Sequence, residues 1–149
     1  MGVAALDWLA AKRGRVVEMP EHLETGERGE LAAVFYLAGK GWKVVARRWN
    51  EGPVRGDLDL VAWDGEVLVF VEVKTRTTVG LAAPQLAVDM RKRRVLRRMA
   101  RQYLRHLPGD APPTTRFDVI TVVELAGEPR RIHHIPAAYG WSERERERY

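Results

Sequence analysis

Apolar residues recur at two spacings along the chain, and the change from one to the other predicts the order of helices and strands. From Glu27 to Ala38 they recur every three or four residues, which is typical of a helix that buries one face, and Gly39 and Gly41 end the pattern. Runs rich in Val and Leu follow and predict three strands, at 42–49, 58–63 and 66–74. The first half of the chain therefore predicts one helix followed by three strands.

The second half predicts one more helix and two more strands. Asp89 is a good N-cap for a helix that Pro108 and Gly109 end. Apolar runs at 116–125 and 130–135 predict a core strand and an edge strand, and alternating Glu and Arg at 143–148 predict a solvated tail. Two helices cannot cover a long parallel sheet, so we expect an α/β domain with a mixed, mostly antiparallel sheet flanked by helices. Its expected bounds are 25–140, between an amino-terminal extension (1–24) and a charged tail (141–149).

The second and third strands predict a hairpin with one acidic face. If Asp64 and Gly65 form a two-residue turn, Asp57 lies opposite Glu72. Residues two apart on a strand share a face, and a turn longer by two residues preserves this parity. The residues that share the acidic face are Asp57, Asp59, Glu72 and Lys74.

Carboxylates gathered on one patch repel each other, and a hard divalent cation such as Mg²⁺, with oxygen ligands at ~2.1 Å, relieves the repulsion. Lys74 could orient or deprotonate a water that the cation acidifies, as metal-assisted hydrolysis of a phosphodiester requires. The carboxylate of Glu30, on the inward face of the first helix, either reaches this patch or is simply a favourable acid in a first helical turn. The alternative for the patch is a solvated face with ion pairs. However, the run 68–73 is apolar on both faces, where unpaired charges are costly.

Composition excludes several other chemistries. The chain of 149 residues has no Cys, which excludes disulfides, a thiolate nucleophile and a Cys-ligated zinc site. Ser142 is the only serine and lies beside the charged tail, which excludes a serine hydrolase. No apolar run approaches the length of a bilayer span, so we expect a cytoplasmic protein without a membrane partner. His133 and His134 point to opposite faces and make a poor chelate, and Asp118 in a core strand is expected to be structural.

The net charge of +5 is concentrated in the second helix, where eight Lys and Arg residues between 89 and 107 face Asp89 alone. Such a face lacks the acidic partners that would neutralise it, which favours contact with phosphates over a merely solvated surface. Lys92, on the apolar stripe of this helix, either extends to water or contacts a phosphate, and Arg76 adds a phosphate contact near the acidic patch. One stripe of the helix is basic throughout, and consists of Arg94, Arg98, Arg101 and Arg105.

Four segments of the chain resemble a known family. GERGELAAVFYL, RGDLDLVAWDGEVLVFVEVKTR, AVDMRK and RFDVI occur in unbroken order and resemble the YraN-like bacterial proteins, which are assigned to the restriction-endonuclease-like superfamily of PD-(D/E)xK nucleases. The likeness covers about residues 25 to 140, and the acidic pair followed by VEVK is its most specific motif. The resemblance implies an αβββαβ core related to the archaeal Holliday-junction resolvases.

By motif position, the resemblance assigns a role to each acidic residue. Asp59 takes the place of the first metal carboxylate of the superfamily, Glu72 that of the second, and Lys74 that of the lysine. Glu30 matches the helical acid of a GE motif in resolvase-like members.

The chain also departs from the family pattern at three positions. Leu58 stands in place of the Pro, Asp57 in place of a frequent Glu, and Arg48 in place of the usual Asn after the first strand. None of these changes removes a metal ligand, and Asp57 is expected to be an auxiliary one.

The leading hypothesis is a Mg²⁺-dependent DNA endonuclease, with Mn²⁺ able to substitute and no small-molecule cofactor. The resemblance to resolvases implies branched or distorted DNA as the substrate and a homodimer as the active form. A DNA-binding module of the same fold with little or no catalysis, and a ribonuclease or RNA-processing factor, are the alternatives.

Overall fold

The structure, a computed structural model, describes residues 24–53, 56–78 and 89–149. The predicted αβββαβ order is confirmed, and a fifth strand completes the sheet. The extension predicted for residues 1–24 lies almost wholly outside the described residues. In chain order the elements are α2 (Thr25–Gly39), β1 (Lys43–Trp49), β2 (Leu58–Asp64), β3 (Val67–Arg76), α3 (Met90–Arg105), β4 (Thr115–Val123) and β5 (Arg131–Tyr139).

The five strands form one mixed sheet in the order β1-β2-β3-β4-β5. Only β3 and β4 are parallel, and α3 lies in the connection between them, as a parallel pair requires. All other neighbouring strands are antiparallel, which confirms the mixed, mostly antiparallel sheet.

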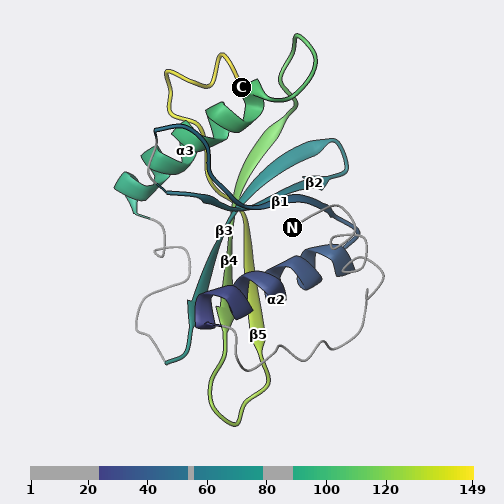
Figure 1. The fold of residues 1–149 in the computed structure, drawn as a ribbon, viewed down its shortest axis with the longest axis vertical. Helices are drawn as coiled ribbons and strands as arrows, with labels where there is room; N and C mark the ends of the chain where they lie inside the picture. The colour runs from purple at the N-terminus through teal and green to yellow at the C-terminus, as the bar shows by residue number, and fades with distance from the viewer. Residues whose placement is uncertain (1–23, 54–55, 79–88) are drawn as a thin grey trace.

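The two helices cover opposite faces of this sheet (Figure 1). Val69 and Val71 of β3 pack under α2, whereas the alternate residues Leu68 and Phe70 pack under α3. Side chains alternate between the faces of a strand, so β3 is apolar on both because both are covered. Glu72 and the charged residues beyond it therefore lie on a strand that is covered on both faces.

The turn between β2 and β3 lies one residue later in the chain than predicted, which shifts the pairing of the two strands by two residues. Asp64 pairs with Val67, so the two turn residues are Gly65 and Glu66 and not Asp64 and Gly65. Gly65 has a φ of 57°, and a positive φ at the first turn residue is the requirement that glycine meets in a type II′ turn. A shift of two preserves the faces, but the register now places Asp59 opposite Glu72, where Asp57 had been expected.

The carboxyl-terminal tail is less solvated than predicted. Trp141 is buried, packs in the core cluster under α3, and stacks on Tyr149 at a centroid distance of 4.5 Å. Its indole Nε1 donates to Thr115 Oγ1 at 2.8 Å. An aromatic residue within the tail thus anchors it to the sheet, although charged residues around it remain exposed.

Candidate functional site

The core of the site is a pair of carboxyl groups, the half-buried Asp59 on β2 and the buried Glu72 on β3. The Glu72 side chain is 2% exposed, and Asp59 Oδ2 accepts a hydrogen bond from the backbone N–H of Val73 at 2.8 Å. Burial and the nearby charge of Glu72 together raise the pKa of Asp59 to about 8. The pair therefore does not hold two negative charges at neutral pH unless a cation joins it.

Two lysines already contact Glu72. The ammonium nitrogen of Lys92, from α3, lies 2.7 Å from Glu72 Oε1, and that of Lys74 lies 3.4 Å from the same oxygen. Burial alone would lower the pKa of Lys92, but its hydrogen bond to Glu72 and the charge of Glu72 raise it. The second oxygen, Glu72 Oε2, is buried and has no hydrogen-bond partner among the described residues.

This donor set fits a hard divalent cation. Glu72 Oε2 is buried without a nitrogen or hydroxyl donor among the described residues, and it lies beside the carboxyl of Asp59, whose pKa is raised by burial, by the charge of Glu72 and by a hydrogen bond between the two carboxyl groups. Within the described ranges, no three acidic or histidine side chains converge on one point. Mg²⁺ is commonly held by one or two carboxylates, with water and a substrate phosphate as its other ligands, so two carboxylates suffice. Asp57 is exposed and acts on the pKa of Lys92 through its charge, and its auxiliary metal role stays a prediction.

Glu30 lies near the pair but is bound to arginines. Its carboxylate Oε2 accepts a hydrogen bond from Arg48 Nε at 2.7 Å and lies 3.7 Å from Arg47 Nη2. Its charge contributes to the raised pKa of Asp59, so α2 does bring this acid towards the sheet. Glu30 thus reaches the surroundings of the acidic pair while two guanidinium groups neutralise it.

Arg48, which stands where the family resemblance leads one to expect Asn, has an unusual backbone conformation. Its φ is 45°, a left-handed value that Asn adopts more readily than most other residues with a side chain. The Arg side chain instead supplies the hydrogen bond to Glu30. A strained residue therefore holds the acid of the GE motif in place.

Gly29 is a residue of the site that the sequence interpretation missed. A Cβ atom added at Gly29 would overlap the hydroxyl of Thr75 and come within 3.0 Å of its Cβ. The absence of a side chain lets α2 approach β3 one residue beyond Lys74. The glycine of the GE motif is the signal that could have identified this close approach.

Comparison with known proteins identifies the family of this chain. The model of a family described as "Uncharacterised protein family UPF0102" matches residues 29–122, which include Glu30, Asp59, Glu72, Lys74 and Lys92. The chain belongs to the UPF0102 family. This confirms the resemblance to the YraN-like proteins. The acids on α2, β2 and β3 and the two lysines that contact Glu72 all lie within the matched part.

Relatives of this UPF0102 chain come from diverse bacteria. A UPF0102 protein of Koribacter versatilis is 48% identical over 103 residues, which is 69% of this chain and 71% of that protein. One of Porphyromonas gingivalis is 43% identical over 122 residues, covering 81% and 87% of the two chains. Among solved structures, Hjc, a Holliday junction resolvase from the archaeal hyperthermophile Archaeoglobus fulgidus, is similar at a TM-score of 0.44 and 19% identity, over 75% of this chain and 77% of that one.

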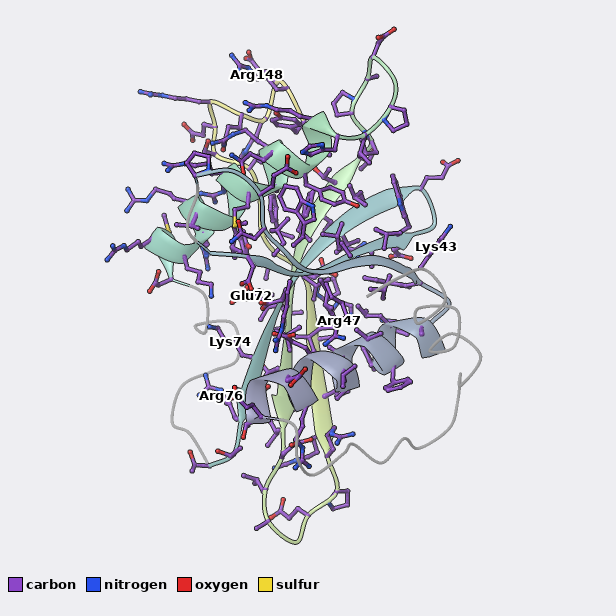
Figure 2. All side chains as sticks on the ribbon, in the orientation of Figure 1. Lys43, Arg47, Glu72, Lys74, Arg76 and Arg148 are labelled. Atoms are coloured by element: carbon purple, nitrogen blue, oxygen red, sulfur yellow. The ribbon has the colours of Figure 1, made fainter. Side chains whose placement is uncertain are left out.

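The basic residues of α3 fall into two groups in the UPF0102 chain. Arg94, Arg98 and Arg105 are exposed on the outer side of the helix, as predicted. Arg101 is paired with Glu145 of the tail, which the sequence did not indicate. Glu72, Lys74 and Arg76 follow each other along β3 (Figure 2). Of the residues on α3 predicted to contact nucleic acid, three arginines are therefore exposed, whereas Arg101 is neutralised by Glu145 within the protein.

Tyr139 is a second residue that sequence reasoning missed. Burial raises the pKa of its hydroxyl, and so do the charges of Glu72 and Asp59, which places the phenol beside the acidic pair. The guanidinium groups of Arg93 and Arg97 lie over its ring, at 5.2 and 5.7 Å from the centroid. Tyr139 thus fixes two arginines of α3 near the site, and no local signal in the sequence reveals this.

A β-bulge and the buried Asp118 explain the position of Tyr139. The pairing of β4 with β5 shifts by two residues between Val119 and Phe117, so Phe117 faces Tyr139. At this bulge Ala137 has a φ of 49°, and its N–H donates to Asp118 Oδ1 at 3.0 Å. Asp118 lies on the α2 face and shapes the strand, as its expected structural role requires.

Across the described part of the chain, no helix combines the length and apolar character needed to cross a bilayer.

Proposed function

We propose that this UPF0102 protein is a Mg²⁺-dependent endonuclease that hydrolyses phosphodiester bonds in DNA. The observation that carries the proposal is the buried Glu72, whose Oε2 has no partner, opposite an Asp59 whose pKa is raised to about 8 by burial and by that same Glu72. Carboxyl groups with strongly shifted pKa values cluster at functional sites.

Asp59 and Glu72 would hold the cation. When bound, Mg²⁺ or Mn²⁺ acidifies a water molecule and neutralises the charge that develops on the phosphate. The hydrogen bond from the N–H of Val73 orients the Asp59 carboxylate by fixing its Oδ2. The Lys74 side chain is 34% exposed, so its ammonium group faces both Glu72 and an incoming phosphate or attacking water. Lys74 would therefore orient that water through its ammonium group, and would accept the proton only as the neutral amine.

The exposed arginines of α3 would bind the DNA backbone. Arg94, Arg98 and Arg105 are exposed on the same helix whose first turn contacts Glu72 through Lys92. Arginine contacts to phosphates are independent of base sequence and weaken steeply with salt. We therefore propose binding by shape and charge. That the substrate is branched or distorted, and that a homodimer cuts it, rests on the sequence resemblance to resolvases.

A cleavage assay tests the proposal. Wild type, Asp59→Asn and Glu72→Gln are incubated with supercoiled, forked, four-way and single-stranded DNA in Mg²⁺, in Mn²⁺ and in EDTA. Asp110→Asn, the same chemical change in an exposed loop, is the matched control. We expect a loss of about 100-fold or more in both site variants, none in the control, and no cleavage in EDTA. Equal cleavage by all four proteins would identify a contaminant and refute the proposal.

A DNA-binding module without turnover is the second candidate, and one observation favours it. Lys74 and Lys92 both contact Glu72 Oε1, so ammonium groups already supply part of the positive charge that a metal ion would bring to this carboxylate. Binding of DNA by wild type without cleavage on any substrate would establish this candidate. The same substrates made of RNA test the third reading, a ribonuclease.

A further inference from the structure

Lys92 makes the shorter of the two lysine contacts to Glu72, and it comes from another element of the fold than the acids. Its ammonium nitrogen is 2.7 Å from Glu72 Oε1, against 3.4 Å for Lys74. The Glu72 side chain is 2% exposed and the Lys92 side chain 43%. One end of the ion pair is therefore fixed in the core, while the other has room to move into solvent.

The first turn of α3 is held independently of this ion pair. Asp89 is its N-cap, and its Oδ1 accepts a hydrogen bond from the backbone N–H of Lys92 at 2.8 Å. The turn therefore stays formed whether the Lys92 side chain points to Glu72 or outwards. Arg91 and Arg94 beside it are exposed, and a helix N-terminus carries a partial positive charge. A phosphate that approaches this turn meets several positive groups.

Lys92 and a divalent cation compete for one carboxylate. Glu72 Oε1 already has two ammonium neighbours, whereas Oε2 has no partner among the described residues. A doubly charged ion between Asp59 and Glu72 would lie within a few ångströms of the Lys92 ammonium and repel it strongly at this buried position. Occupation of the site by one cation therefore weakens the binding of the other.

We propose that Lys92 is an exchangeable counter-ion of Glu72. It neutralises the carboxylate in the metal-free protein, leaves when a divalent cation binds, and then contacts a phosphate of the nucleic acid. This inference rests on the proposed function and adds to it that metal binding and DNA binding are coupled through one side chain. The coupling is reciprocal, because each ligand must change the affinity of the other by the same factor.

Isothermal titration calorimetry with Mn²⁺ alone tests the first half of the proposal, the competition between Lys92 and a divalent cation for Glu72. Without DNA, Lys92→Gln is expected to bind Mn²⁺ about tenfold more tightly than wild type, because the competing cation is gone. Arg94→Gln removes the same charge from the next exposed position and is expected to stay within about twofold of wild type, since long-range effects are screened. Lys92→Arg keeps the charge and is expected to resemble wild type. A Lys92→Arg variant that binds as tightly as Lys92→Gln would overturn the proposal.

Binding of a labelled four-way DNA, with and without Ca²⁺, tests the second half. Ca²⁺ is expected to increase the affinity of wild type about tenfold and that of Lys92→Gln much less. Equal Mn²⁺ affinity in wild type and Lys92→Gln would overturn the exchange and leave the metal centre intact. Absence of Mn²⁺ binding in both proteins, with Asp59→Asn as the blank, would refute the metal centre and the exchange together.

Discussion

The sheet of this UPF0102 protein carries two aspartates, the buried Asp118 and the half-buried Asp59, and their surroundings are opposite. On the α2 face, Asp118 is fully buried and accepts hydrogen bonds from Arg116 Nε at 2.8 Å, His134 Nε2 at 2.7 Å and the N–H of Ala137 at 3.0 Å. On the α3 face, Asp59 accepts one backbone hydrogen bond and lies beside another carboxyl. Asp118 is surrounded by hydrogen-bond donors, whereas Asp59 has too few of them.

The pKa directions follow from this difference. Burial would raise the pKa of Asp118, but hydrogen bonds from His134, Arg116 and Ala137 outweigh it and lower the pKa. For Asp59, burial and the charge of Glu72 act in the same sense and raise it. A buried acid with a full set of donors is part of the scaffold, and we propose that Asp59, which lacks them, is a ligand of a cation.

The largest expected effect comes from removing the satisfied aspartate. Asp118→Ala leaves Arg116 and His134 without their buried partner and the bulge at Ala137 without its acceptor. The free energy of unfolding should fall by about 3–5 kcal/mol. Urea denaturation measures it, and a loss under about 1 kcal/mol would show that the network is not structural.

Replacing the unsatisfied aspartate should stabilise the metal-free protein. As the pH rises from about 4 to about 8, the unfolded chain loses the Asp59 proton that the folded chain keeps, so the free energy of unfolding falls across this window. Asp59→Asn removes this fall, and at pH 9 in EDTA it should be more stable than wild type by on the order of 2 kcal/mol.

The same titration distinguishes the two aspartates. Because the pKa of Asp118 is lowered, its contribution to stability is complete above about pH 4 and is lost only as the pH falls below that value. Parallel pH profiles of wild type and Asp59→Asn between pH 4 and 9 would contradict the assignment of Asp59. Addition of Mg²⁺ should restore wild type and leave Asp59→Asn unchanged.

A methyl group at Gly29 should disturb the α2 face close to the site. Because the added Cβ overlaps Thr75, Gly29→Ala should cost about 1–2 kcal/mol and move Glu30 and Lys74 relative to each other. Gly26→Ala is the matched control, since no atom lies within 4 Å of its added Cβ. Thermal unfolding and cleavage are measured together. Equal behaviour of the two variants would mean that the close approach is not needed.

The smallest effect in free energy concerns the outer surface of α3. Arg94→Gln and Arg98→Gln should each reduce the slope of log Kd against log salt by about one unit, because each loses a phosphate contact. Arg101→Gln should change the slope less, since Glu145 already neutralises that guanidinium. Fluorescence anisotropy at several salt concentrations measures the slopes. A larger change for Arg101 than for Arg94 would place the DNA on another surface.

Local pattern was enough to predict the elements and the face on which the acids lie. Hydrophobic spacing identified the helices and strands, and the two-residue period of a strand put Asp59, Glu72 and Lys74 on one side for any turn with an even number of residues. The particular turn was predicted wrongly, because Asp-Gly and Gly-Glu are both acceptable turn pairs and only the packing of the two strands selects between them.

The sequence by itself therefore determined the αβββαβ order, the acidic face and the basic character of α3, since each depends on residues close together in the chain. Tertiary structure alone decided that Lys92 reaches Glu72, that Arg48 holds Glu30, and that a bulge at Ala137 brings Tyr139 beside the acids. These contacts join residues 18 to 80 positions apart. Their geometry depends on how helices pack on a twisted sheet, which no spacing along the chain encodes.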